Sequence, residues 1–492
     1  MSPPPARSSH QDDWKQHWKS FLGAVGMSFL LLQLLFLGNM SYMYGTQYRD
    51  SERIHQLKLL YVDFDGDIIG QSVLDSYGAL QGATFPTLHQ ASTEDFATGQ
   101  DVRNAVCHGD YWGAIYVNPG ASARLAASLS GDADSSNSSN TNASTALTYI
   151  WNGARYPAFA QSAVYSNLLT LIEATRSTYY ARNASNVLQT LLLAPSSSAS
   201  SSTSTALTAF LDPITAREHN IKATAQGGRV LYNTVSIVMP IIQQFFFMMA
   251  LNGLSAQFQL FTRLTPRANG LLRLSISGCY TFVGALCMVG YIWAFRESWA
   301  VSGGQFVLCW MAVWLYMHIH FQIVDVLTTY VPMQFMPFCI LTWAILNVAS
   351  TVSPFEMQPG FFRWAYALPA HELYQVLVQI WSDGCENQLR TALPVLFSWW
   401  VVGAGSATVA THRRCRVAAA AAAAVGHGKG LEDSTADGKA ESVRTGSSTQ
   451  GILPGRGTDR RNTIEMERLE SAAYGPRYPT PLVSGDGGRS SV

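Results

Sequence analysis

The sequence predicts a polytopic α-helical membrane protein that carries one large α/β domain outside the membrane. Of its 492 residues, 48% are hydrophobic and only 13% are charged. Charged residues make up roughly 25% of an average soluble protein, so the composition favours a membrane protein. The second observation is a set of six long apolar segments, and the third is the polar stretch 45–229 between the first two of them. Formal net charge is zero, so nothing global indicates a nucleic-acid partner.

A membrane-spanning helix needs about 20 consecutive apolar residues. Six segments meet this length and are the predicted spans: Phe21–Tyr44, Val230–Leu251, Leu274–Phe295, Gln305–Val326, Gln334–Val352 and Leu393–Thr411. The first follows Lys15 and Lys19 and has no small-residue cleavage site after it. It is therefore expected to remain as a signal anchor rather than to be removed.

Basic residues set the expected orientation. If the six spans alternate, one side receives all of the following: Lys15, Lys19, Arg263, Arg267, Arg273, Arg413, Arg414 and Arg416. The positive-inside rule places that side in the cytoplasm. Residues 1–20 and the tail 412–492 are then cytoplasmic, residues 45–229 form an extracellular domain, and residues 230–411 form a five-span domain. The tail is rich in Gly, Ser, Thr and mixed charge, so it is expected to be disordered.

The outer domain contains two stretches typical of strands, "LKLLYVDFD" and "WGAIYVNP", each followed by a Gly-containing turn and a helix-compatible segment. Three N-x-[ST] sequons in this domain, at Asn137, Asn142 and Asn183, are predicted glycosylation sites. Such a glycoprotein belongs in the plasma membrane or another membrane of the secretory pathway.

Seven cysteines are present, and only Cys107 and Cys385 fall on the predicted outer side. An oxidising compartment permits a disulfide between them, and the sequence equally permits two free thiols.

The segment 368–383 combines "HE" with a run of apolar residues. Zinc proteases need a second histidine one turn after the first, and Gln375 occupies that place after His371. A helix of about 13 residues at 1.5 Å per residue is about 20 Å long, too short for a hydrocarbon core of about 30 Å. The segment is therefore expected to be an interfacial or re-entrant helix on the outer side.

Several long blocks carry a resemblance to a known family. They are "YNTVSIVMPIIQQFFFMMALNG", "YIWAFRE", "WLYMHIHFQIVD", "MPFCILTWAILNVASTVSPFE" and the stretch 368–385. In these blocks the sequence resembles the fungal nitrosoguanidine-resistance membrane proteins, which are related to ABC-2-type permeases and YhgE/Pip-like proteins. The resemblance implies an ABC-2-permease-like layout of one span, an outer domain and five further spans. It also implies multidrug resistance, with export as one route, and it brings no functional residues.

Export by an ABC-type mechanism requires ATP hydrolysis, and the chain contains no G-x-x-x-x-G-K-[ST] motif. A separate ATPase subunit is therefore the partner expected for that mechanism, and a homodimer is expected by analogy with permeases of this layout. Proton coupling is the alternative. His318, Gln322 and Asp325 lie at i, i+4 and i+7 of the fourth span, on one helix face.

These three residues have two interpretations. Polar groups within the membrane are costly, so they are candidates for a substrate or proton pathway. Alternatively, they are structural: Asp325 lies at the cytoplasmic end and caps the span or meets Arg263 or Arg273, and His318 bonds to a neighbouring helix. Gln243, Gln244 and Asn347 are further polar candidates within the predicted spans.

The leading functional hypothesis is a permease-like protein that exports toxic small molecules or lipids and also contacts membrane lipids. The rival hypothesis is a membrane organiser or scaffold that does not transport and changes stress tolerance indirectly. The sequence offers no nucleophile–base pair and no cluster of metal ligands, so no catalytic residue, cofactor or metal is expected.

Overall fold

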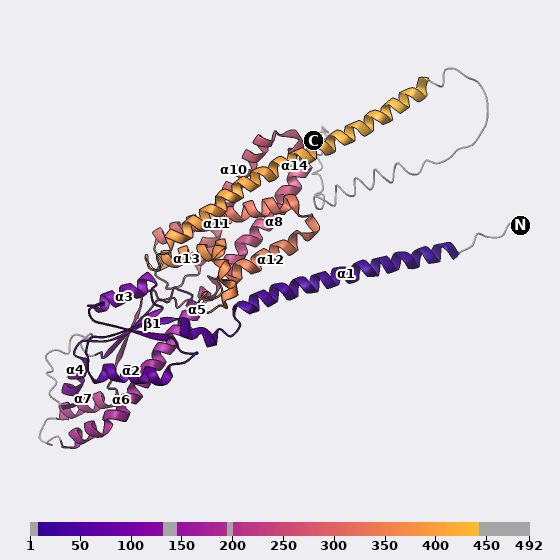
Figure 1. Ribbon diagram of the computed structural model, residues 1–492. Coiled ribbons are helices and arrows are strands. Elements are labelled where there is room, and N and C mark those ends of the chain that lie inside the picture. Colours follow the sequence, from indigo (N-terminus) through magenta and orange to yellow (C-terminus); the bar gives the residue numbers. More distant parts are fainter. Residues whose placement is uncertain (1–7, 131–144, 194–199, 442–492) are drawn as a thin grey trace, which may run out of the picture. The chain divides into compact units, whose positions relative to one another are not determined.

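The computed structural model describes residues 8–130, 145–193 and 200–441 (Figure 1). Contacts within the chain divide it into two compact units. The first unit comprises Met1–Val238, Met288–Val313 and Thr342–Leu396. The second unit comprises Met239–Cys287, Trp314–Leu341 and Phe397–Val492. Several long helices contribute residues to both units.

The first unit contains a mixed five-stranded sheet with the strand order β2-β1-β3-β4-β5. The strands are β1 Lys58–Asp63, β2 Thr87–Ala91, β3 Gly113–Val117, β4 Leu147–Trp151 and β5 Ala216–Asn220. β1 is parallel to both β2 and β3, β4 is parallel to β5, and β3 and β4 are antiparallel. The two strands predicted from the sequence are β1 and β3, and the expected α/β domain is confirmed.

Helices connect and cover these strands. They are η1 Ser51–Gln56, α2 Ile68–Leu80, α3 Gly99–His108, α4 Ala121–Ser130, α5 Pro157–Phe159, the π-helix η3 Ala160–Tyr165, α6 Ser166–Leu193 and α7 Ser200–Leu211. The ends of α3 follow from local chemistry. Thr98 and Asp101 form a capping box at its start, and Gly109 adopts a left-handed conformation at its end.

Side-chain alternation along β1 explains why both faces of the sheet are covered. Leu60 and Val62 point to one face, where they join a core with α3 residues such as Val102. Tyr61 points to the other face and donates from its hydroxyl to the carbonyl of Gly70 on α2, at 3.1 Å. α2 packs beside α6 on that second face (Figure 1).

Five helices in the described residues are long and apolar enough to cross a membrane. Their apolar stretches are Phe21–Thr46 in α1 (Ser8–Thr46), Val235–Gln257 (α8), Pro266–Ala294 (α10), Gly303–Tyr330 (α11) and Leu389–Ala424 in α14 (Leu389–Glu441). These lengths and compositions are those of a multi-pass membrane protein.

The fifth predicted span, Gln334–Val352, is longer than the helix that the structure forms there. A 3₁₀ turn, η5 Met333–Phe335, is followed by a helix of 14 residues, α12 Met336–Ala349. At 1.5 Å per residue this helix is about 21 Å long, shorter than a hydrocarbon core of about 30 Å. The apolar run continues beyond Ala349, but the backbone there leaves the helix and forms a turn.

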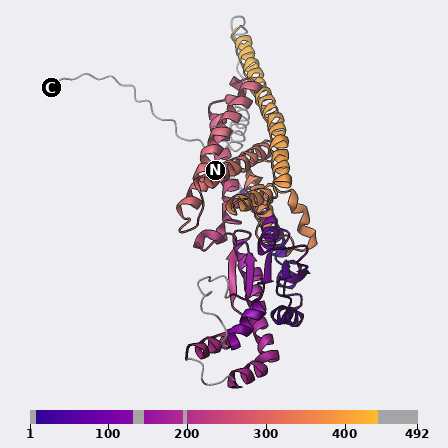
Figure 2. The same cartoon turned by 90° about the vertical axis from the view of Figure 1, so that its left-hand side faces the viewer.

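The predicted tail, 412–492, begins inside a helix. α14 continues as one helix to Glu441 (Figure 2). Its extension passes through the alanine run 418–424, and alanine has the highest intrinsic helix propensity. The rest of the predicted tail, 442–492, lies outside the described residues.

The predicted outer helix is present as α13 Pro369–Trp381, preceded by the 3₁₀ helix η6 Gly360–Ala367. Ten of its 13 residues are buried by protein. The helix is therefore packed mostly against protein, and its placement as an interfacial or re-entrant helix stays a prediction. The hydrophobic residues that suggested a membrane surface pack inside the first unit.

Candidate functional site: a cavity with buried polar groups among three long helices

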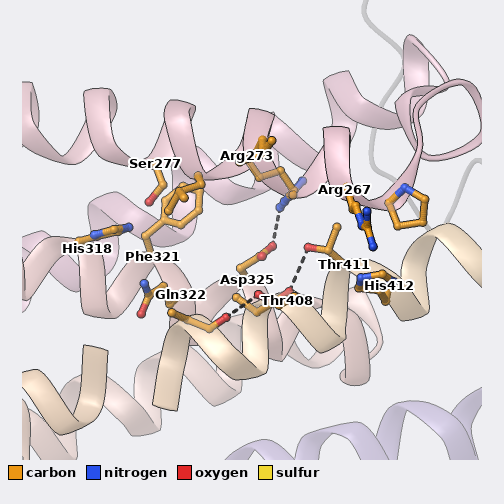
Figure 3. Close-up of a pocket in the computed structure, with 16 residues that line it drawn as sticks. Arg267, Arg273, Ser277, His318, Phe321, Gln322, Asp325, Thr408, Thr411 and His412 are labelled. Carbon is orange, nitrogen blue, oxygen red and sulfur yellow. Dashed lines mark hydrogen bonds and ion pairs between the residues drawn. The ribbon is translucent and has the colours of Figure 1, made fainter. Parts of the chain in front are cut away.

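The second unit contains a cavity of about 430 Å³ that is lined by α10, α11 and α14 (Figure 3). The three residues of the predicted polar stripe, His318, Gln322 and Asp325, all line it from α11. The other lining residues are Pro266, Arg267, Gly270, Leu271, Arg273, Leu274, Ser277, Phe321, Ala404, Ala407, Thr408, Thr411 and His412. The 3.6-residue period of α11 therefore places the predicted stripe on the wall of a cavity.

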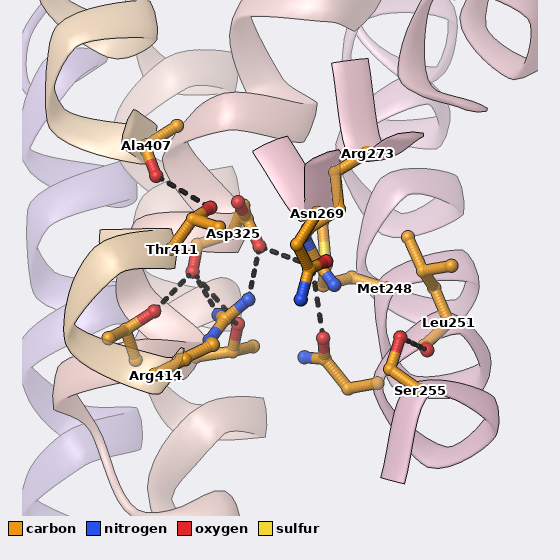
Figure 4. Close-up of polar contacts among 12 residues, drawn as sticks. Met248, Leu251, Ser255, Asn269, Arg273, Asp325, Ala407, Thr411 and Arg414 are labelled. Atoms are coloured by element: carbon orange, nitrogen blue, oxygen red, sulfur yellow. Dashed lines mark hydrogen bonds and ion pairs between the residues drawn. The ribbon is translucent and has the colours of Figure 1, made fainter. Parts of the chain in front are cut away.

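Asp325 binds two arginines from different helices (Figure 4). Arg273 on α10 donates from Nη2 to Asp325 Oδ1. Arg414 on α14 donates from Nη1 to the same oxygen at 2.7 Å. All three side chains are buried or nearly so, with exposed fractions between 4% and 12%. The structural interpretation of Asp325 predicted Arg273 as a partner, whereas Arg414 was not predicted.

Further hydrogen bonds hold the two guanidinium groups in place. Arg273 Nη2 also donates to Asn252 Oδ1 at 3.0 Å and approaches Met248 Sδ at 3.1 Å. Arg414 Nη2 donates to Thr328 Oγ1 at 2.6 Å. This network joins α8, α10, α11 and α14 at one level of the second unit.

His318 accepts a hydrogen bond at Nδ1 from Trp400 Nε1, at 3.2 Å. An indole nitrogen only donates, so Nδ1 must be the unprotonated nitrogen of a neutral ring. Nε2 then carries the hydrogen and is a donor. This contact is also the interhelical bond that the structural interpretation predicted for His318.

Several buried polar atoms of the lining have no hydrogen-bond partner among the described residues. They are Arg273 Nε and Nη1, Ser277 Oγ, His318 Nε2 and Gln322 Oε1. An unsatisfied buried polar atom costs about 1–3 kcal/mol. Four lining side chains thus retain unused hydrogen-bonding capacity in one cavity.

The other polar candidates do not line this cavity. Gln244 on α8 is fully buried, and neither side-chain polar atom has a partner among the described residues. Gln243 accepts a hydrogen bond through its backbone oxygen from Tyr280, at 3.4 Å. Asn347 belongs to the first unit, where its Nδ2 donates to the carbonyl of Trp343 at 2.9 Å.

The first unit contains a second polar cluster, around a disulfide between Cys107 and Cys385. The bond joins the end of α3 to the turn after α13. Beside it, Arg155 Nη1 lies 3.0 Å from Glu386 Oε1, and the Arg155 guanidinium stacks 3.6 Å above the Trp112 ring. Burial raises the pKa of Glu386 to about 7, although Arg155 acts in the opposite direction.

The "HE" pair of α13 is part of the protein core. His371 packs against the rings of Phe355 and Tyr366, and its Nδ1 lies 3.3 Å from the carbonyl oxygen of Ser350. Burial lowers the pKa of His371 to about 4 and raises the pKa of Glu372 to about 7. No group of three or more potential metal ligands is present in the part of the chain that the structure describes.

Of the predicted glycosylation sites, only Asn183 is described. It lies on α6, half-buried, and its Nδ2 donates to the carbonyl of Tyr179 at 3.2 Å. Asn137 and Asn142 lie outside the described residues.

Residues 28–405 match the family described as "Protein of unknown function (DUF3533)". This match covers more than half of the chain. The chain belongs to the DUF3533 family. The matched range contains α8, α10 and α11 complete, parts of α1 and α14, the whole α/β domain and α13.

A relative of this DUF3533 protein is the uncharacterized endoplasmic reticulum membrane protein YJR015W of Saccharomyces cerevisiae. The two sequences are 29% identical over 123 residues, which cover 24% of each chain. The match therefore spans about a quarter of the yeast protein. No solved structure matches this chain.

Sequence reasoning missed Arg414, Trp400 and Ser277 as parts of the cavity region. A signal for Arg414 was present, because it is a basic residue directly after an apolar run. In the sequence, that signal indicated only the orientation of the chain in the membrane. Arg414 becomes a partner of Asp325 because α14 continues as a helix beyond the apolar run. Trp400 and Ser277 carry no signal that separates them from ordinary residues of a span.

Proposed function

We propose that this DUF3533 protein is a permease-like membrane protein that moves amphipathic small molecules, drugs or lipids, by way of the cavity in its second unit. The observation that carries the proposal is the combination of apolar walls with buried polar atoms that lack partners. Ligand cavities typically have volumes of about 300–1,000 Å³ with a few placed polar groups on an apolar lining. The volume of about 430 Å³ falls within that range.

The location of the polar groups supports the proposal. A buried arginine and histidine with unused donors are costly within a membrane helix bundle, and such groups generally mark substrate or ion pathways. The ion pairs of Asp325 with Arg273 and Arg414 give part of the polar lining a structural role. They do not account for the unused atoms of Ser277, His318 and Gln322.

Resistance to toxic compounds such as nitrosoguanidine is the proposed consequence of export, on the basis of the resemblance to the ABC-2-related resistance proteins. The proposed mechanism includes no enzymatic step in this chain. A separate ATPase subunit is the proposed energy source, because the sequence lacks a nucleotide-binding motif. A homodimer is the proposed assembly.

The relative's printed name refers to the endoplasmic reticulum membrane. We therefore propose a membrane of the secretory pathway, with the endoplasmic reticulum as the first compartment to examine and the plasma membrane as the second. Fluorescence microscopy of the tagged full chain against markers of both compartments tests this assignment.

An efflux measurement tests the function. Cells with and without the protein are loaded with a labelled alkylating drug, and loss of label is followed over time. The decisive variant is Ala407→Phe, which places a ring in the cavity lining. Its control is Val409→Phe, on the same helix at a residue that is 60% exposed and does not line the cavity.

Faster loss with the wild-type protein, abolished by Ala407→Phe and retained by Val409→Phe, is the expected result. Equal loss in all strains, together with a difference in drug survival, would remove the exporter proposal. That outcome would favour the membrane organiser, which alters tolerance without moving the drug.

A further inference from the structure

Up to Ala424, the second unit has an excess of positive charge. Within residues 239–287, 314–341 and 397–424, Asp325 is the sole acidic residue. The same ranges contain six arginines: Arg263, Arg267, Arg273, Arg413, Arg414 and Arg416. Asp325 is shared by two of them, so its single negative charge does not neutralise both.

This excess reaches the cavity. Arg267 and Arg273 line it, with Asp325 as the opposing carboxylate. In Figure 3 the Arg273–Asp325 pair lies between the end with Arg267 and His412 and the end with His318. An uncompensated buried charge is strongly unfavourable, and it is relieved when an anion enters.

The unused donors indicate the chemistry of that anion. Arg273 Nε and Nη1 and the Nε2–H of His318 have no acceptor among the described residues. Guanidinium groups bind phosphate and carboxylate oxygens well, because their donors are arranged as a planar fork. The cavity therefore offers several donors to an oxyanion.

The remaining wall is apolar and continuous with the outer surface of the helices. Leu271 and Leu274 line the cavity, and they are 66% and 52% exposed. Residues that both line a cavity and are exposed mark its mouth. In a membrane protein, an apolar mouth of this kind favours entry of a hydrocarbon chain.

We propose that the cavity binds an amphipathic oxyanion, with its phosphate or carboxylate at Arg267 and Arg273 and its hydrocarbon chain along Leu271, Leu274 and Phe321. This inference rests on the proposed function, since both use the same cavity. It adds the class of ligand, which the proposed function leaves open.

Direct binding to the full-length protein, purified in detergent, tests the ligand class. The labelled probe is a monoacyl glycerophosphate. The competitors are its choline ester, which has no net charge, glycerol phosphate, which has no chain, and a fatty acid with a carboxylate. The monoacyl glycerophosphate is expected to bind at least about tenfold more tightly than the choline ester and glycerol phosphate. The fatty acid is expected to compete.

Two variants test whether the ligand binds in this cavity. Arg273→Lys keeps a positive charge beside Asp325 but removes the forked donors, and it is expected to weaken binding about tenfold. Arg267→Gln removes the arginine at the exposed end, and its matched control is Arg263→Gln, which does not line the cavity. Arg267→Gln is expected to weaken binding about threefold while Arg263→Gln binds as the wild type does. Elution volume and unfolding temperature identify a variant that fails to fold.

Equal affinity for the choline ester would show that the site does not require a net negative charge on the ligand. Equal affinity for glycerol phosphate would show that the site does not require a hydrocarbon chain. Either result would overturn the proposed ligand class. Absence of binding by all probes, or an equal effect of Arg263→Gln, would overturn the site. The efflux result is independent of these outcomes. Selective binding without efflux would support the ligand class and contradict the proposed transport function. Efflux without a preference for the anion would support transport and contradict the ligand class.

Discussion

Arg414 on α14 donates to Asp325 on α11 at 2.7 Å, and the carboxylate oxygen that it contacts also accepts from Arg273 on α10. One acidic side chain thus joins three long helices. A buried carboxylate with two guanidinium partners is tightly held, because removal of the acid leaves two buried cations facing each other.

Asp325→Asn is therefore expected to destabilise the protein by about 3–5 kcal/mol, the range for breaking a buried ion pair. Thermal unfolding of the purified protein measures this loss as a lower unfolding temperature. The control is Asp212→Asn, whose side chain is 49% exposed and pairs with Arg176 at 3.3 Å. The control is expected to lose less than about 1 kcal/mol. An equal effect of both substitutions would contradict a special role for the Asp325 network.

The disulfide between Cys107 and Cys385 links residues that are 278 positions apart. A cross-link that closes so long a loop stabilises a fold by about 2–5 kcal/mol, chiefly by restricting the unfolded chain. Cys107→Ser is expected to lower the unfolding temperature and to abolish the mobility difference between oxidised and reduced protein on a gel. The control is Cys279→Ser, because Cys279 is free and exposed. A mobility difference that persists in Cys107→Ser would mean another pairing.

Glu372 contributes a pH-dependent instability. Burial raises its pKa from 4.5 to about 7, so the folded protein binds a proton that the unfolded chain has released between those pH values. Stability therefore falls as pH rises from about 4.5 to about 7, and the full cost is present above pH 7. Glu372→Gln removes this cost and is expected to stabilise the protein at pH 8, by on the order of 2 kcal/mol. At pH 4 the substitution is expected to be nearly neutral.

The measurement is the difference in unfolding temperature between Glu372→Gln and the wild type from pH 4 to pH 8. His371 acts with the opposite sign, because burial lowers its pKa from 6.5 to about 4. Its contribution is full above pH 6.5 and is lost as pH falls towards 4. Because His371 is present in both proteins, its effect cancels in the difference. A difference that does not change with pH would contradict the raised pKa of Glu372.

Position 109 requires glycine for two reasons, its backbone conformation and the close approach of a neighbouring side chain. Its φ is +87°, and a Cβ at this position would lie 2.5 Å from Glu386 Oε2. Gly109→Ala is therefore expected to destabilise the protein by about 1–3 kcal/mol. The matched control is Gly78→Ala within α2, where a Cβ meets no atom within 4 Å. Since alanine favours a helix, the control is expected to be stabilising by about 0.5–1 kcal/mol in thermal unfolding. Two substitutions of the same sign would contradict this account.

The sequence by itself determined the features that depend on composition and periodicity. The long apolar helices, the strands β1 and β3 and the ends of α13 were predictable because the local pattern is strong at each of them. The helical period also placed His318, Gln322 and Asp325 on one face.

Only the tertiary structure decided what those features contact. The run Gln334–Val352 is apolar enough for a span, yet its helix ends at Ala349, because hydrophobicity measures affinity for an apolar environment and does not specify helix length. The apolar side chains of α13 likewise face protein rather than lipid. Asp325 had several arginines available in the sequence, and the choice of Arg273 and Arg414 depends on how α10, α11 and α14 pack. Packing between distant segments is non-local, so no sequence window contains it.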